Sequence, residues 1–405
     1  MIRENKILLF EPLATGEAGH GLDNLLEDAE VFKKNYKIIA FVNKNFNKNI
    51  ITPTYIELFK ICETDHKGRL FNLLPFIMNF IFLIKFLIKN KKSLLFIKAF
   101  IKNFLTFPYY FFSCYKEYFS CYLSQNDQIV IESCRNKDIE LLYFLSCLDK
   151  NFPAVHIKVR YPPKKKKLKN FFFYAKKFKE KLGDRFNIYT EIENINNITQ
   201  KNLEFKIKHF TQPYTFYSRN NVNKTLTLGF LGESRNEKGF NKLPELLSSI
   251  YKNNYDINFI IQISNNIYPY TIDNRKKILE LSKQYNKIKI LNGYLDFYGW
   301  RDTLKKIDIM PILYDKDYGE KIGSGLFYSC IAHEIPLIIP EGSRALIKFL
   351  KYQCYLEADN LDDYVDKILK LYKNYDFYLV EAKKQSTYYK KILSDYDDLI
   401  KTINK

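Results

Sequence analysis

The sequence predicts an α/β protein built from two halves, and three observations lead to this prediction. At 405 residues the chain is too long for one small core, so two domains are expected. Short apolar runs typical of buried strands alternate with helical patterns both before residue 161 and after residue 225. Between the two halves, residues 198–224 lack a clear periodicity and contain Pro213, which is typical of a linker.

The first half contains the alternation twice, on either side of a long apolar segment. The expected strands are 6–13, 36–43, 127–134 and 153–161, and the expected helices are 22–34 and 136–148. The second half repeats it more regularly. Its expected strands are 225–231, 257–264, 287–291, 307–313, 335–339 and 354–358, and its expected helices are about 238–252, 273–285, 297–306, 324–333, 342–350 and 361–374.

Two such halves imply two Rossmann-like domains that face each other across a cleft. We expect the N-terminal domain over residues 1–215 and the C-terminal domain over 216–376. Helical periodicity over the last residues predicts a helix within 377–405.

The amino-acid composition restricts the classes of partner that the protein is expected to bind. The 64 lysines and arginines exceed the 45 acidic residues, and the net charge of +19 favours an anionic partner: a nucleotide diphosphate, nucleic acid or an acidic membrane surface. The seven cysteines form no CxxC pair, which indicates a reducing compartment. The five histidines lie far from one another, so no metal site is expected. The N-terminus turns polar too soon for a signal peptide, which favours a cytoplasmic location.

Residues 67–124 form an insertion rich in Phe, Leu, Ile and Lys. The apolar run 71–88 approaches the length of a membrane span, but Pro75 and Lys85 are among the residues that interrupt it. The alternatives are two core helices with outward lysines and an amphipathic surface that dips into a membrane. Residues 164–181 add a lysine face and an aromatic face, which fit a solvated helix, single-stranded nucleic acid or membrane docking. We expect docking to an anionic membrane, because both segments lie in the same half.

The stretch "GFLGESRNEKGFNKL", residues 229–243, carries the first candidate site. It is neither a Walker A motif nor a GxGxxG. Arg235 offers a planar fork for phosphate oxygens and Lys238 a mobile point charge, and both follow a predicted strand. Gly232 and Gly239 permit a tight turn beside a ligand, and a helix beginning near Lys238 would add N–H donors. The alternative is a charged surface loop that caps a helix.

A second candidate loop follows the predicted strand that ends at Leu313. It contains several carboxylates, of which Glu320 could accept hydrogen bonds from sugar hydroxyls or be a solvated loop acid. Gly323, Ser324 and Gly325 then open a helix, whose N-terminal N–H groups favour phosphate.

This order of motifs resembles the donor-binding domain of GT-B glycosyltransferases, closest to the family-4-like group, over roughly residues 225–350. The resemblance implies that Arg235 and Lys238 bind the diphosphate of a nucleotide sugar, with Gly232 and the start of the 324–325 helix beside it. It also implies a transfer without metal or cofactor, and a C-terminal helix that packs back across the hinge.

The family's later loop carries two glutamates eight positions apart, of which the first contacts the sugar and the second the ribose. Counting back from Pro336, these places fall on Lys321 and Ser329, so Glu320 corresponds only with a one-residue slip, and no glutamate stands at the ribose position.

The N-terminal "EPLATGEAGHG" is similar to the glycine-rich first loop of these enzymes, where His20 would line the cleft, although an ordinary loop histidine fits equally well. The sequence does not choose between retention and inversion. An inverting enzyme needs a base in the N-terminal domain, and the conceivable residues are His20, Glu17, Glu132 and His156.

We therefore predict a glycosyltransferase that moves a sugar from a nucleotide-diphosphate sugar to a glycan or lipid-linked acceptor. The expected role is bacterial surface polysaccharide synthesis, such as capsule or lipopolysaccharide, on the inner face of the cytoplasmic membrane. The alternatives are a nucleic-acid-binding protein, suggested by the charge, and a non-catalytic membrane-associated protein with a degenerate transferase fold, suggested by Ser329.

Overall fold

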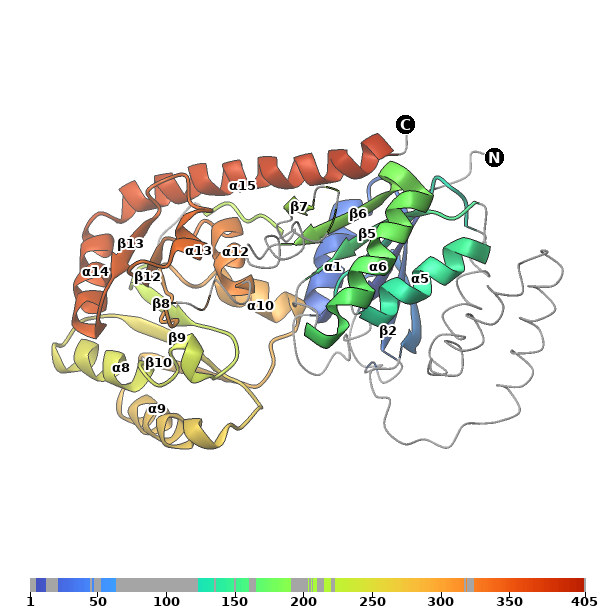
Figure 1. Cartoon of the computed structure of the whole chain (residues 1–405). Coiled ribbons are helices and arrows are strands. Elements are labelled where there is room, and N and C mark those ends of the chain that lie inside the picture. The colour runs from blue at the N-terminus through green and yellow to red at the C-terminus, as the bar shows by residue number, and fades with distance from the viewer. Residues whose placement is uncertain are drawn as a thin grey trace. The chain divides into compact units, whose positions relative to one another are not determined.

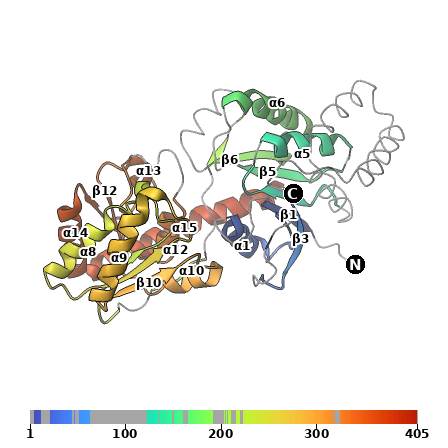
Figure 2. The same ribbon diagram turned by 90° about the horizontal axis from the view of Figure 1, so that it is seen from below.

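The computed structural model forms two compact units (Figures 1 and 2). Residues 1–191, 195–210 and 399–405 belong to the first unit, and residues 192–194 and 211–398 to the second. The structure describes residues 5–11, 21–43, 46, 52–62, 123–134, 136–148, 151–159, 165–190, 203, 205, 207–209, 215–219, 223–316, 318 and 324–403. The predicted insertion at 67–124 therefore lies almost entirely outside the described residues.

The first unit is built on a seven-stranded parallel sheet with the strand order β3-β2-β1-β4-β5-β6-β7. Its strands are β1 (Lys6–Glu11), β2 (Lys37–Asn43), β3 (Ile56–Cys62), β4 (Gln128–Ile131), β5 (Ala154–Lys158), β6 (Phe186–Thr190) and β7 (Lys208–His209). Its helices are α1 (Gly21–Phe32), α5 (Asn136–Leu148) and α6 (Lys165–Leu182), followed by the short helix η1 (Gly183–Arg185). Nearly continuous burial along β1, β4 and β5 is what a parallel sheet covered on both faces requires.

Helices α5 and α6 lie side by side (Figures 1 and 2), and aromatic rings join them. Tyr143 of α5 packs against Tyr174 and Phe178 of α6, with ring centroids 5.7 Å apart in both pairs. Phe178 in turn stacks on Phe186 of β6 at 4.8 Å. The aromatic face predicted for residues 164–181 thus faces the sheet in part.

The second unit contains two three-stranded parallel sheets, ordered β10-β9-β8 and β11-β12-β13. Its strands are β8 (Thr227–Phe230), β9 (Asn258–Ile263), β10 (Ile288–Asn292), β11 (Met310–Pro311), β12 (Leu337–Pro340) and β13 (Tyr355–Ala358). An isolated parallel bridge between Leu228 and Ile309 joins the two sheets. Its helices are α8 (Leu243–Lys252), α9 (Ile272–Gln284), α10 (Phe297–Leu304), α12 (Gly325–Ala332), α13 (Arg344–Ile347), α14 (Leu361–Lys373) and the long α15 (Tyr375–Ile403), with short helices η2 (Asn236–Lys238) and η3 (Pro269–Thr271).

Alternate residues of these strands enter two separate apolar clusters, as the two-residue period of a strand requires. Phe259 and Ile261 of β9 pack with α8, α9 and α14, whereas Ile260 packs with α10, α12 and α13. Both faces of the sheets are therefore covered, which explains why the strands read as unbroken apolar runs.

Several predicted elements are shorter in the structure. The helix expected at about 238–252 begins only at Leu243, because the turn η2 and the left-handed Gly239 (φ +82°) precede it. Lys238 therefore does not stand at the N-terminus of that helix, and this expectation was wrong. The helix expected at 342–350 spans only Arg344–Ile347.

Among the described residues, no helix is long and apolar enough to cross a membrane. The run 71–88, for which a span was one alternative, lies outside them.

Candidate functional site

The loop after β8 is fixed by hydrogen bonds to the neighbouring strand β9. The Gly232 backbone N–H donates to Gln262 Oε1 at 2.8 Å, and the Gly232 φ of +105° places it in the region that favours glycine. Ser234 and Ser264 then exchange two bonds, each backbone N–H donating to the other's hydroxyl at 3.1 and 3.0 Å. The loop therefore leaves the carboxyl end of β8 in one defined conformation.

Gly239 brings this loop into direct contact with the segment that follows β11. A Cβ atom at Gly239 would lie 2.3 Å from both Cβ and the carbonyl oxygen of Leu313. The backbone N–H of Asp315 donates to the Glu237 carbonyl at 3.0 Å, and Lys242 Nζ donates to the Leu313 carbonyl at 3.1 Å. Only glycine allows this approach, so the two loops predicted from the sequence are held against each other.

Lys238 is a buried cation in this loop, with 9% of its surface exposed. Its Nζ lies beside Gly232, where an added Cβ would sit 3.7 Å away. Burial, together with the Arg235 charge, lowers the pKa of Lys238 to about 8. The Lys238 ammonium forms no ion pair with any residue that the structure describes. Removing most of a lysine from water costs folding free energy, and the charges of Glu233 and Glu237 offset only part of that cost. A bound anion would offset more of it.

Arg235 lies half-buried beside Lys238 and is held by three side chains. Its guanidinium pairs with Glu233 at 3.3 Å and Glu237 at 3.1 Å, and it donates to the Tyr318 hydroxyl at 3.2 Å. Burial raises the pKa of Glu233, but hydrogen bonds from Tyr268 and Asn266 and the Arg235 charge lower it overall. Glu233 is therefore a fixed carboxylate beside Arg235.

Two tyrosines connect Arg235 to the start of α12. The rings of Tyr318 and Tyr314 pack with centroids 4.5 Å apart, and the Ser324 hydroxyl donates to Tyr314 Oη at 3.1 Å. Ser324 also caps α12, since its Oγ accepts the backbone N–H of Phe327 at 3.2 Å. The structure thus joins Arg235 to Ser324 through these tyrosines, a link that no spacing in the sequence indicated.

Of the remaining predicted site residues, the structure describes one and leaves three outside the described part of the chain. Gly325 begins α12 directly after Ser324. His20, Glu320 and Gly323 lie outside the residues that the structure describes, so their roles stay predictions.

Ser329, which occupies the predicted ribose position, faces the protein interior. It is 1% exposed, and its Oγ accepts the Trp300 indole N–H at 3.4 Å. His333 hydrogen-bonds the Ser329 carbonyl at 2.8 Å, and burial lowers the pKa of that histidine to about 4. Ser329 is therefore engaged within the fold.

Two of the four candidate bases of the first unit, His156 and Glu132, are also buried, whereas Glu17 and His20 lie outside the described residues. His156 lies between Gln128 and Tyr189, at 2.9 and 3.1 Å, and burial, with nearby lysine charges, lowers its pKa to about 3. Glu132 pairs with Lys158 at 2.9 Å, and Lys158 also pairs with Asp28. Burial and the Glu132 charge raise the pKa of Asp28 well above its usual range. The sequence did not lead us to expect this Lys158–Asp28 pair. The one feature that could have indicated it is a lysine at the end of an otherwise apolar strand.

No group of three or more His, Cys, Asp or Glu side chains suited to a metal ion occurs in the part of the chain that the structure describes.

Comparison with known proteins gives matches among solved structures. The chain is similar to a glycosyltransferase from Rickettsia africae (TM-score 0.56, 12% identity, covering 98% of this chain and 99% of that one). It is also similar to a sucrose-phosphate synthase from Thermosynechococcus elongatus (TM-score 0.52, 10% identity, 98% and 99% covered). A third match is a UDP-forming trehalose-phosphate synthase from Burkholderia xenovorans (TM-score 0.50, 10% identity, 99% and 97% covered).

The chain has the GT-B fold. No family model and no curated protein sequence matches it. The predicted α/β class with GT-B architecture is confirmed, whereas the narrower likeness to the family-4-like group stays a prediction.

A first prediction concerns Gly239. Gly239→Ala forces a side chain into the left-handed region and against Leu313, whereas Gly342→Ala (φ +71°) meets only the flexible end of Lys316 at 3.2 Å. Because overpacking typically costs about 1–3 kcal/mol, we expect Gly239→Ala to lower the free energy of unfolding by about that much more than Gly342→Ala. Urea denaturation of both variants measures the difference. An equal loss of unfolding free energy in the two variants would contradict the prediction, because it would show that the loop at Gly239 can move to accommodate the methyl group.

A second prediction concerns pH. Anion binding needs the protonated ammonium, so affinity for a nucleoside diphosphate should fall as pH rises through about 8, the pKa of Lys238. The stability of the ligand-free protein should change in the opposite direction. Because the folded-state pKa lies below the unfolded value of about 10.4, the unfolded chain binds more protons in this window and stability rises with pH.

The measurement is calorimetric titration from pH 7 to 9.5, where the ligand's phosphates are already ionised. Lys238→Met is the reference, and its affinity should vary much less over the same range. A wild-type profile as flat as that of Lys238→Met would contradict the assignment.

Proposed function

We propose that this protein is a glycosyltransferase that moves a sugar from a nucleotide-diphosphate sugar to a glycan or lipid-linked acceptor. The observation that carries the proposal is the buried Lys238, which lacks an ion-pair partner among the described residues and lies beside Arg235 where β8 ends. The GT-B fold supports it, since ligands of open parallel sheets bind at the carboxyl ends of strands.

The chemistry asked of this site is stabilisation of a leaving diphosphate. As the bond between sugar and phosphate oxygen breaks, negative charge grows on the diphosphate, and fixed cations lower the barrier. Lys238 would bind as a point charge, while Arg235 would exchange Glu233 and Glu237 for phosphate oxygens. We propose that these two cations and the N–H groups at the start of α12, next to Ser324, do this without a metal ion.

We propose a uridine diphosphate sugar as the first donor to test. One similar structure is titled as a UDP-forming synthase, and another, from E. coli, as bound with UDP-2-fluoro glucose (TM-score 0.50, 12% identity, 98% and 99% covered). Those words describe the other proteins and support only the choice of ligand. We further propose a role in bacterial surface polysaccharide synthesis.

One observation favours a second candidate, a non-catalytic protein with a degenerate transferase fold. Ser329 stands where the resemblance places a glutamate, and it is bonded to Trp300 in the interior. A protein of this kind would show neither donor binding nor transfer, so the experiment below separates the two candidates.

The test replaces the two cations singly. Arg235→Ala and Lys238→Ala each remove a charge-assisted contact worth about 1.5–3 kcal/mol, so each should weaken UDP binding ten-fold or more. Lys252→Ala, which removes an exposed lysine at the end of α8, is the matched control and should bind as wild type does.

Calorimetry with UDP and uridine reports this loss, and release of UDP from UDP-sugars reports turnover. Wild type should prefer UDP to uridine strongly, and the double variant should lose most of that preference. If both single variants bind UDP with wild-type affinity, the loop at 232–239 only caps a helix, and the glycosyltransferase proposal loses its main support.

We also propose that the protein is cytoplasmic and docks peripherally on the inner face of the membrane. The support from the structure is the exposed face of α6, where Phe173 is 53% exposed next to the exposed Lys169. Lys177 and Lys179 of the same helix pair with Glu180 and Asp184, which reduces the charge available to a membrane.

Co-sedimentation with phosphatidylglycerol and phosphatidylcholine vesicles tests this docking. Each basic residue near an anionic surface contributes about 1 kcal/mol, and the attraction weakens with salt. Lys169→Glu with Phe173→Ser should therefore reduce binding to anionic vesicles several-fold, while Lys252→Glu should not. Equal, negligible sedimentation of wild type with both vesicles would end the idea.

A further inference from the structure

The loop at 233–238 carries as many negative charges as positive ones. Arg235 and Lys238 supply two cations, and Glu233 and Glu237 supply two carboxylates within the same six residues. The loop therefore has no net positive charge of its own when all four groups are ionised. An anionic ligand meets both attraction and repulsion here at close range, so the contacts of the two carboxylates bear directly on how it binds.

The Arg235 guanidinium is engaged at each of its three nitrogens. Its Nε lies 3.3 Å from Glu233 Oε2, its Nη1 lies 3.1 Å from Glu237 Oε1, and its Nη2 donates to the Tyr318 hydroxyl at 3.2 Å. A phosphate that binds an arginine bidentately takes N–H groups from two neighbouring nitrogens. Such a ligand therefore competes with groups that are already in place.

The two carboxylates differ in how they are held. Glu233 accepts hydrogen bonds from the Tyr268 hydroxyl at 2.7 Å and the Asn266 amide at 2.6 Å, in addition to its ion pair. Among the residues that the structure describes, the Glu237 carboxylate forms no ion pair or hydrogen bond other than that with Arg235, and its side chain is 39% exposed. The backbone carbonyl of Glu237 is held by an N–H group of the segment after β11. Its side chain can therefore turn into solvent while the loop keeps its path, whereas Glu233 leaves only by breaking two further bonds.

We propose that Glu237 sets how tightly this site holds a nucleoside diphosphate. Its carboxylate occupies Arg235 in the empty protein, leaves it when a phosphate enters, and returns to the guanidinium as the diphosphate departs. The inference rests on the proposed donor site and adds to it a residue that weakens binding. The consequence for a transferase is faster release of the nucleoside diphosphate product, a step that limits turnover in many enzymes.

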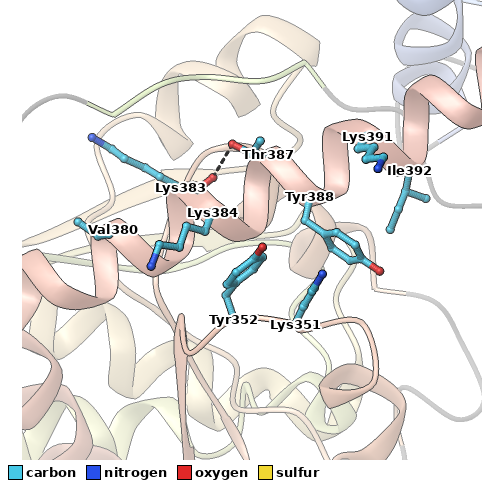
Figure 3. A pocket seen from close by; sticks show the side chains of 9 residues that line it. All are labelled: Lys351, Tyr352, Val380, Lys383, Lys384, Thr387, Tyr388, Lys391 and Ile392. Carbon is cyan, nitrogen blue, oxygen red and sulfur yellow. Dashed lines mark hydrogen bonds between the residues drawn. The ribbon is translucent and has the colours of Figure 1, made fainter.

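A second group of lysines provides a control for unspecific anion binding. It lines a groove between α15 and the turn that precedes β13, and Figure 3 shows the side chains. Lys384 pairs with Glu381 at 2.7 Å, and Lys351 Nζ lies 4.9 Å from the ring centroid of Tyr388. None of these residues belongs to the loop at 233–238, so replacing both lysines should leave binding at that loop unchanged.

Calorimetric titration of the full-length chain with UDP and uridine tests the inference. Glu237→Gln keeps the size of the side chain and removes its charge. It should bind UDP about two- to five-fold more tightly than wild type does, the ratio that corresponds to an exposed ion pair worth about 0.4–1 kcal/mol. Uridine has no phosphate and should bind equally to both. Glu280→Gln makes the same charge change at an exposed position on α9 and should bind UDP as wild type does.

The Arg235→Ala background separates competition for the guanidinium from simple repulsion of the ligand. If Glu237 acts by occupying Arg235, Glu237→Gln should change UDP affinity much less in Arg235→Ala than in the wild-type chain. Equal tightening in both backgrounds overturns the inference, because repulsion alone then explains the effect. Weaker UDP binding by Glu237→Gln also overturns it, because Glu237 would then orient Arg235 for the ligand.

A failure of the donor site gives a different result. If wild type and Glu237→Gln bind UDP no better than uridine, both the donor site and this inference are overturned. If Arg235→Ala loses the preference for UDP but Glu237→Gln has wild-type affinity, only the inference is overturned. Loss of UDP binding in Lys351→Gln with Lys384→Gln would place the diphosphate in the groove and overturn both.

Discussion

The candidate site depends on the close approach of Gly239 to Leu313. At this point the loop after β8 crosses the segment after β11 with no room for a side chain, and backbone bonds on either side fix the crossing. Because the loop is also tied to β9 through Gly232, it has little freedom between its two ends. Lys238 lies inside this short span, so its burial follows from the backbone path rather than from its own packing.

That burial has an energetic consequence. A lysine whose ammonium group is largely removed from water usually pairs with a carboxylate. Glu233 and Glu237 both lie close to Lys238. Both form ion pairs with Arg235, and Lys238 forms none with any residue that the structure describes, although their charges still act on it. If the loop binds an anion as proposed, the fold accepts lower stability here in return for a preorganised site, which is a common trade at functional positions.

The alternation of apolar runs and helices sufficed to predict the α/β class. Residue chemistry pointed to Arg235 and Lys238, which the structure places in one loop and whose role stays a prediction. The start of α8 was missed because a left-handed glycine and a short helical turn look like helix in a one-dimensional pattern. The link through Tyr318 and the contact of Lys351 with the Tyr388 ring could not be predicted either. Each joins segments far apart in the chain, and long-range contacts leave no periodic signal.

The substitution at the predicted ribose position bears on how binding energy is distributed. Ser329 is nearly inaccessible, and its hydroxyl is already bonded to Trp300, so it cannot replace a glutamate that would contact the ribose. If the donor is a nucleotide sugar, less of its affinity can come from the ribose at this position. A larger share then has to come from the diphosphate, where Arg235 and Lys238 supply two cations within one loop. A site of this kind gains selectivity for charged ligands over nucleosides, because its strongest contacts exist only when the phosphates are present.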